Sequence, residues 1–297
     1  MKLINSSVEI LPQVKDKQSL YEAIELAGRV AYKSEDMITA DSAKKFVDML
    51  KRKKHNAALE HGTIYLTVPL MEGGKPNNDA TNYYSFFQSN PYSVVNADGK
   101  MFYITTNLRV LVENHRTSYL KYITPCTDNH ERRITVRFTC DRGVSHELVR
   151  HRVFSFLQES TRFCNYSKDK FNNQLTFIIP QWAKQLPEGT YNYLDGQWLV
   201  YNLANTIQFN ADEHTPENLL LWGLSNDESY YLKMIKDFNL KPQEARQILP
   251  NALKTEVIMT GTVSQWDAFF SLRCAEDAHP DMRKLALELK DKIQNDR

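Results

Sequence analysis

Apolar residues recur every three or four positions over several stretches of the chain, a period typical of amphipathic helices. Between Ser19 and Tyr32 the apolar positions include Leu20, Ile24 and Ala27. The same spacing predicts further helices at Asp41–Lys54, Tyr193–Phe209, Pro216–Phe238, Gln243–Thr255 and Asp281–Ile293.

Other stretches have the pattern of strands. The clearest are His61–Leu70, which Pro69 ends, and Arg133–Cys140. Leu175–Ile179 is a short apolar strand, and Phe102–Val112 is either one strand or a strand that runs into a helix. Because alternation favours antiparallel pairing, we expect an α+β fold with a mostly antiparallel central sheet flanked by helices, in a single domain over residues 1–297.

The segment Met71–Lys100 follows neither period. It is rich in Gly, Asn, Ser and aromatic residues. Because long segments without a clear period are commonly functional or inserted loops, we expect an inserted flap at about residues 71–100.

The composition is that of an ordinary globular protein, with 42% hydrophobic, 25% charged and 11% aromatic residues, which excludes bulk disorder. Lys and Arg number 37 against 36 Asp and Glu, so the formal net charge is +1. Any anion-binding site must therefore come from a local group of cations. With only ten glycines, a fold with several Gly-rich phosphate loops is disfavoured.

The sequence predicts a cytoplasmic protein, because it shows neither a secretory signal nor an apolar stretch of membrane-spanning length. The four cysteines, at 126, 140, 164 and 274, are far apart and form no CxxC pair. This spacing predicts reduced thiols rather than a zinc site or a disulfide framework. Cys164 is the candidate nucleophile among them, since it lies beside the most charged segment of the chain.

That segment is His146–Arg162, with the sequence HELVRHRVFSFLQESTR. Ser145 as N-cap predicts a helix over about His146–Phe156. One face of this helix would carry Glu147, Arg150, His151 and Phe154. The apolar face that would pack on the sheet would consist of Val149, Val153, Phe156 and Leu157. Arg152 would point about 200° away from Arg150. Because His151 follows His146 at i+5 instead of i+4, we expect no metal site.

Residues Gln158–Arg162 offer amide, carboxylate, hydroxyl and guanidinium groups that can bind the base, ribose and phosphate of a nucleotide. A surface helix with ion pairs explains the same residues, so spacing alone leaves both interpretations open. The basic run Lys51–Lys54 likewise suits either the end of a helix dipole or a phosphate.

Arg150-His151-Arg152, followed after seven residues by Ser160, matches an RHRx7S motif, and the chain here resembles the flavin-dependent thymidylate synthases. Further matching pieces, in the family's order, are Gly28–Ala31, His55–His61, Ser160–Arg162, Tyr166–Lys168, Ala245–Pro250 and Phe270–Arg273. The chain departs from the family at Ala31, Ala57 and Ala58. It has Thr262 and Ser264 where an Asn and an Arg of the flavin site are expected.

The resemblance implies a methyltransferase that converts dUMP to dTMP. Its carbon donor would be methylenetetrahydrofolate, and FAD, reduced by NADPH, would carry the hydride. It also implies a homotetramer with active sites at subunit interfaces. The implied dUMP-binding residues are Glu147, Arg150, Gln158, Glu159, Ser160, Thr161, Arg162, Arg246 and Arg273. The implied FAD-binding residues are His55, Ala57, Glu60, Arg150, His151, Arg152, Val153, Gln158, Thr262 and Ser264.

By the same resemblance, Ser160 and Arg273 are the catalytic residues. Ser160 would donate a hydrogen bond to the uracil, and Arg273 would stabilise the ionised uracil N3. The alternative role of Arg273 is structural, as the partner of Glu276 or Asp277 in an ion pair. For His55 and Glu60 the alternatives are a helix end and a strand-edge contact.

Two other functions stay open. One is a non-catalytic phosphate or nucleic-acid binder that uses Lys51–Lys54 and Arg150–Arg152. The other is a scaffold that has lost flavin through the changes at Ala57, Thr262 and Ser264.

Overall fold

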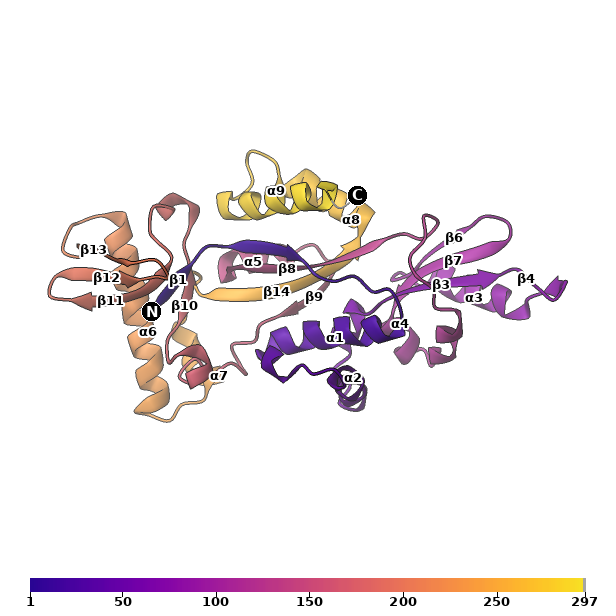
Figure 1. The fold of residues 1–297 in the computed structure, drawn as a ribbon, viewed down its shortest axis with the longest axis horizontal. Helices are drawn as coiled ribbons and strands as arrows, with labels where there is room; N and C mark the ends of the chain where they lie inside the picture. The colour runs from indigo at the N-terminus through magenta and orange to yellow at the C-terminus, as the bar shows by residue number, and fades with distance from the viewer. Residues whose placement is uncertain (296–297) are drawn as a thin grey trace.

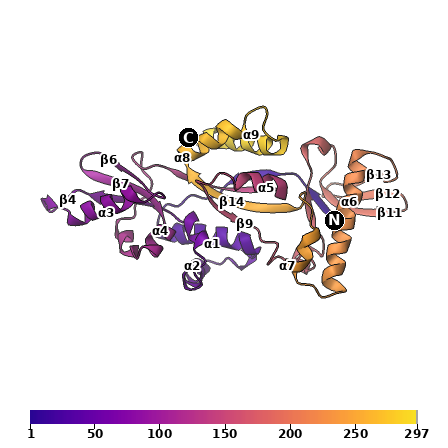
Figure 2. The ribbon, with the colours of Figure 1, turned by 180° about the vertical axis from the view of Figure 1, so that it is seen from behind.

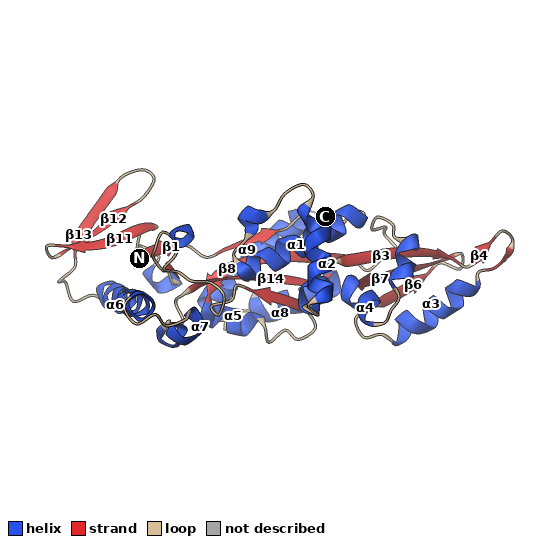
Figure 3. Cartoon of the chain, turned by 90° about the horizontal axis from the view of Figure 1, so that it is seen from below, coloured by secondary structure: helices blue, strands red, loops and turns tan. Residues whose placement is uncertain are grey.

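The computed structural model describes residues 1–295, apart from the side chains of residues 78, 79 and 81. Three β-sheets follow one another along the long axis of the molecule, with helices packed around them (Figures 1 and 3). The expected combination of helices with mostly antiparallel strands is confirmed, but three sheets and a small hairpin replace the one central sheet. In the described range, no helix has both the length and the apolar character needed to cross a membrane.

The middle sheet has the strand order β2-β8-β14-β9, and all its pairs are antiparallel. Its strands are β2 Ser7–Ile10, β8 Arg133–Asp141, β9 Ser155–Gln158 and β14 Lys254–Thr262. Along β14, Val257 and Met259 are buried in one core, while Ile258 between them is buried in another. Helices therefore cover both faces: α8 Val263–Arg273 and α9 Pro280–Asn295 on one, α1 Lys17–Tyr32 on the other (Figure 2).

Helix α1 begins with a capping box, in which the Asp16 carboxylate accepts a hydrogen bond from the Ser19 backbone N–H at 2.8 Å. Helix α2 Ser42–Arg52 packs on α1 at Gly28, where an added Cβ would lie 2.5 Å from Phe46 Cε1. The predicted helices at Ser19–Tyr32, Asp41–Lys54, Pro216–Phe238 and Asp281–Ile293 are confirmed as α1, α2, α6 Pro216–Lys236 and α9.

The sheet at the N-terminal end has the order β10-β1-β11-β12-β13, in which only the β1–β10 pair is parallel. Its strands are β1 Lys2–Ile4, β10 Thr176–Ile178, β11 Gly189–Leu194, β12 Gln197–Tyr201 and β13 Thr206–Asn210. Helix α6 packs against this sheet and shares its core (Figure 1).

The helix predicted at Tyr193–Phe209 is wrong, because these residues belong to β11, β12 and β13. Asp195 and Gly196 join β11 to β12, and their φ angles of 47° and 78° are those of a tight hairpin turn. Trp198 and Val200 then point into the core from alternate positions of β12. The Asp-Gly pair was the hairpin signal in the sequence.

The sheet at the other end has the order β3-β7-β6, with β3 Thr63–Pro69, β6 Val94–Ala97 and β7 Met101–Asn107. Segment 71–100, expected as an inserted flap, contains the hairpin of β4 Met71–Glu72 and β5 Lys75–Pro76, helix α3 Asn78–Ser89, and β6. Tyr83 and Phe87 of α3 are buried in the core of this sheet, so the segment is packed against the fold.

Strand β7 continues directly into helix α4 Leu108–Glu113, which confirms the strand-into-helix interpretation of Phe102–Val112. The strands predicted at His61–Leu70, Arg133–Cys140 and Leu175–Ile179 are confirmed as β3, β8 and β10.

The helix predicted at His146–Phe156 is wrong over most of its length. Helix α5 Arg142–Leu148 starts earlier because Asp141, not Ser145, caps it: the Asp141 carboxylate accepts a hydrogen bond from Val144 N at 2.8 Å. The chain then turns, and β9 pairs with β14 from residue 155 onward. Val149 and Val153 are 41% and 66% exposed, so the predicted apolar helix face does not exist.

The helix predicted at Gln243–Thr255 is also wrong. Helix α7 Pro242–Ala245 continues only as a 3-10 turn, η6 Arg246–Ile248, and β14 begins at Lys254. The other 3-10 turns are η1 Glu35–Met37, η2 Asn56–His61, η3 Thr117–Tyr122, η4 Asp169–Phe171 and η5 Gln181–Ala183. Strand β14 lacks a polar face because both of its sides are covered, which hides it from an alternation pattern.

Candidate functional site

A cavity of about 560 Å³ lies where α1, η2, α4 and the chain after β9 meet. Five residues of the predicted site line it: His55, Ala57, Gln158, Ser160 and Arg162. We call this the Ser160 cavity. The structure thus brings the segment around the RHRx7S motif together with the His55–His61 segment, although the two are far apart in the chain.

The residues at the end of β9 and just after it are divided between two cavities. Backbone hydrogen bonds hold Glu159 N to Glu256 O at 2.8 Å and Ser160 N to Ala31 O at 3.0 Å. Leu157, Gln158 and Ser160 line the Ser160 cavity, while Glu159 lines a different one. The Gln158 Nε2 group donates hydrogen bonds to Ser145 Oγ at 2.9 Å and to Thr255 Oγ1 at 3.1 Å.

The Ser160 cavity suits a phosphorylated ligand with a flat ring. Its lining includes the cations Lys54, Arg109 and Arg162. The rings of Tyr32 and Phe163, also in the lining, have centroids 5.1 Å apart. Guanidinium groups bind phosphate and aromatic rings pack on flat heterocycles, so both parts of such a ligand find partners.

The His55 side of the cavity continues the C-terminal end of α2. His55 Nδ1 lies 3.3 Å from the Tyr32 hydroxyl. In the basic run, Lys51 and Arg52 occupy the last turn of α2, as the helix-dipole interpretation predicts, while Lys54 lines the cavity. Glu60 pairs with Arg109 at the edge of this region.

Arg273 forms a second cluster with two other predicted residues. Its Nη1 lies 2.6 Å from Glu147 Oε2, and its Nε donates to His151 Nε2 at 2.9 Å. Burial, together with the positive charge of Arg273, lowers the pKa of His151 to about 4. The imidazole is therefore neutral at neutral pH and accepts the hydrogen bond. Arg273 pairs with Glu147, so the expected alternative of a pair with Glu276 or Asp277 is not what forms.

The other predicted residues lie outside the lining of the Ser160 cavity. Arg150, Arg152 and Val153 are exposed in the turn between α5 and β9, and Arg246 is exposed in η6. Thr262 caps α8 and its Oγ1 lies 2.9 Å from the Ser264 hydroxyl, which donates to Glu131. Thr161 is buried. Because residues 149–154 are not helical, the predicted separation of about 200° between Arg150 and Arg152 does not apply.

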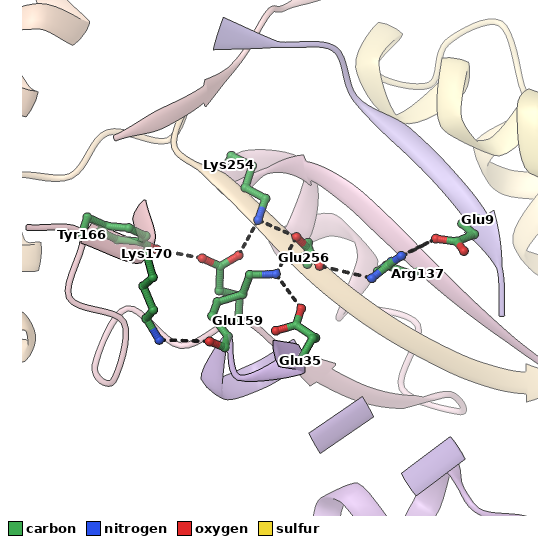
Figure 4. A network of polar contacts seen from close by, with 9 residues as sticks. Glu9, Glu35, Arg137, Glu159, Tyr166, Lys170, Lys254 and Glu256 are labelled. Carbon is green, nitrogen blue, oxygen red and sulfur yellow. Dashed lines mark hydrogen bonds and ion pairs between the residues drawn. The ribbon is translucent and has the colours of Figure 1, made fainter. Parts of the chain in front are cut away.

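Glu159 belongs to a network of ion pairs that joins the C-terminal end of α1 to the start of β14 (Figure 4). Its side chain is 2% exposed, its carboxylate pairs with Lys254 at 2.9 Å, and it accepts a hydrogen bond from the Tyr166 hydroxyl at 3.1 Å. Lys254 also pairs with Glu256 at 2.6 Å, and Lys33 joins Glu256 at 2.8 Å. Lys33, Glu159, Tyr166 and Lys254 of this network line a cavity of about 330 Å³.

Cys164 is fully buried beside this network. Burial, and then the charge of Glu159, raise the pKa of its thiol to about 12. A thiol that stays protonated at neutral pH is a poor nucleophile. Among the side chains that the structure describes, no three of His, Cys, Asp or Glu gather in a way that could hold a metal ion.

Several residues of the Ser160 cavity were missed by sequence reasoning. Arg109 and Glu113 come from α4, and Tyr32 and Phe163 supply the aromatic pair. The i,i+4 spacing of Arg109 and Glu113 was a visible sign of an exposed helix face. Nothing local in the sequence indicates that this face meets the motif.

Residues 129–296, more than half of the chain, match a family model described as "Thymidylate synthase complementing protein". The chain belongs to this family. The match contains Gln158, Ser160 and Arg162, whereas the α1, η2 and α4 walls of the Ser160 cavity lie before it.

Curated relatives agree with this membership. The flavin-dependent thymidylate synthase of Corynebacterium efficiens is 30% identical over 157 residues, covering 52% of this chain and 54% of the relative. Those of Geobacter sulfurreducens and Pyrococcus furiosus are 28% and 31% identical, over 50% of this chain and 50% and 49% of the relatives. The chain thus spans about half the length of the curated relatives it matches.

Among solved structures, the UMP/dUMP methylase PolB of Streptomyces cacaoi, bound with 5-Br dUMP, aligns with a TM-score of 0.44 and 15% identity. That alignment covers 99% of this chain and 93% of PolB.

Proposed function

We propose that this protein methylates dUMP to dTMP, with methylenetetrahydrofolate as carbon donor and FAD, reduced by NADPH, as hydride carrier. The observation that carries the proposal is the Ser160 cavity, where His55, Ser160 and Arg162 meet. Membership in the family, and the printed names of the relatives, support it.

In this proposal FAD supplies the hydride chemistry when bound, and the residues of the chain bind and orient the reactants. Arg162 attracts the phosphate of dUMP. The Ser160 hydroxyl donates a hydrogen bond that polarises the uracil. His55, Ala57 and Gln158 contribute to the flavin side of the same cavity. The presence of these five residues in the lining of the cavity supports these roles.

Arg273 is the proposed catalytic cation. A permanent positive charge beside ionised uracil N3 lowers the energy of the developing anion. Its pairing with Glu147 and with neutral His151 holds the guanidinium in one orientation. Because Arg273 lies outside the Ser160 cavity of its own chain, the proposal assigns it to the cavity of a neighbouring subunit in a cytoplasmic homotetramer.

The remaining predicted residues are assigned to the same composite site. For dUMP these are Glu147, Arg150, Glu159, Thr161 and Arg246. For FAD they are Glu60, Arg150, His151, Arg152, Val153, Thr262 and Ser264.

The visible spectrum of the purified protein tests the proposal. We expect the yellow absorbance of an oxidised flavin, bleached by NADPH faster when dUMP is present, and dTMP formed once methylenetetrahydrofolate is added. A colourless protein that cannot be reconstituted with FAD would contradict it. Affinity for polyanions that falls steeply with salt, without turnover, would instead favour a phosphate or nucleic-acid binder that uses Lys51–Lys54 and the exposed Arg150 and Arg152.

A further inference from the structure

One wall of the Ser160 cavity comes from helix α4, which lies before the family-matched residues. Leu108 and Leu111 of α4 are fully buried. Arg109 and Glu113, four residues apart, share a different face of the helix and line the cavity. Leu108 N donates to Gly62 O at 2.9 Å, which anchors the start of α4 to the end of η2.

Two carboxylates hold the Arg109 guanidinium in place. Its Nε donates to Glu113 Oε1 at 2.9 Å, and its Nη1 pairs with Glu60 Oε1. Glu113 Oε1 also accepts a hydrogen bond from Asn56 Nδ2 at 2.9 Å, which connects α4 to the segment that carries Ala57. The Nη2 group of Arg109 has no hydrogen-bond partner among the contacts of the described residues, and the side chain is 40% exposed.

The charges around the cavity favour an anionic ligand. Lys54, Arg109 and Arg162 carry positive charge in the lining, against the carboxylate of Glu113 in the lining and that of Glu60, which pairs with Arg109 at its edge. Lys54 and Arg109 precede the family-matched range, while Arg162 lies within it. A phosphate in this cavity would therefore meet cations from both parts of the chain.

We propose that Arg109 determines specificity in this cavity by binding a phosphate group of its ligand. The inference rests on the proposed function, which supplies two phosphate-bearing ligands, dUMP and FAD. A guanidinium presents its donors as a planar fork that fits a phosphate. Because Glu60 and Glu113 already order the Arg109 side chain, ligand binding loses less side-chain entropy. Glu60, predicted to touch flavin, thereby acts as a positioning residue through Arg109.

Isothermal titration calorimetry on the purified full chain tests this with two pairs of probes. The first pair is dUMP and deoxyuridine, and the second is FAD and riboflavin. Within each pair only the phosphate-bearing compound can gain from Arg109. We expect Arg109→Gln to reduce the preference for phosphate roughly tenfold in one pair, with the dephosphorylated compound bound as before. The affected pair identifies the phosphate that Arg109 binds.

A matched control is Lys44→Gln. Lys44 forms another helical i,i+4 pair, with Asp48, but its side chain is 74% exposed and does not line the cavity. This variant should keep both preferences. Arg109→Lys keeps the charge but loses the fork, so it should lose several-fold of the preference. Thermal unfolding verifies that each variant is folded.

The outcomes separate this inference from the function on which it rests. Suppose that the wild-type protein binds dUMP and FAD, and that Arg109→Gln and Arg109→Lys keep its phosphate preferences. This result overturns the role of Arg109 and leaves the proposed function standing. If Arg109→Gln does not fold, an unchanged preference in Arg109→Lys overturns it. Wild-type protein that binds none of the four probes overturns both the proposed function and the inference.

Discussion

Glu256 is the carboxylate on which three cations of the network in Figure 4 converge. Lys254 lies 2.6 Å from it, Lys33 2.8 Å and Arg137 3.8 Å. Burial alone would raise the pKa of Glu256, but the charges of Lys254 and Lys33 outweigh burial and lower it from 4.5 to about 2. A difference of this size corresponds to about 3 kcal/mol of stability. Because the side chain is only 11% exposed, solvent screens little of it.

We therefore expect Glu256→Gln to lower the free energy of unfolding by about 3 kcal/mol in neutral solution. The pKa of this carboxylate is lower in the folded state. Its contribution is thus fully present above the unfolded pKa of 4.5 and is lost as the pH falls through about 2. By about pH 3, roughly 2 kcal/mol of the difference between wild type and variant should have disappeared. Urea denaturation of both proteins between neutral pH and about pH 3 measures this trend.

Glu9→Gln is the matched control. Glu9 pairs with Arg137 in the same network, but its side chain is 54% exposed. An exposed pair contributes less than about 1 kcal/mol, so this variant should be close to wild type. The reasoning is refuted if the Glu256→Gln difference stays constant as the pH falls, or if Glu9→Gln costs as much.

Three further predictions concern the motif and its surroundings. Arg273→Ala should abolish dTMP formation while the circular dichroism spectrum stays native, and near wild-type turnover would show that the catalytic assignment is wrong. Gly261→Ala should lower stability by about 1–3 kcal/mol in urea denaturation, because its Cβ would overlap the Phe154 ring. Gly223→Ala, with nothing within 4 Å, should show no loss. A thiol reagent should label exposed Cys126 and spare buried Cys164, and equal labelling rates would contradict the raised pKa of Cys164.

The sequence predicted those elements whose pattern is local. Helices α1, α2, α6 and α9 each bury some residues and expose others, so their helical period shows in the sequence. Strand β14 has no exposed residue, so no alternation marks it in the sequence, and its first two residues fall in the helix predicted at Gln243–Thr255. The helix predicted at His146–Phe156 was wrong for a related reason. Strand β9, which begins within it, is held by its pairing with β14, and that pairing leaves no local pattern in the sequence.

For the site, the sequence determined the residue types and the order of the motif segments, which sufficed to recognise the family. Which of these residues share a cavity was decided by the tertiary structure. Ser160 and Glu159 are neighbours in the chain but line different cavities, and α4 supplies Arg109 from outside the family-matched residues. Periodicity reports which face of an element is covered, whereas contacts between distant segments depend on how the sheets and helices pack.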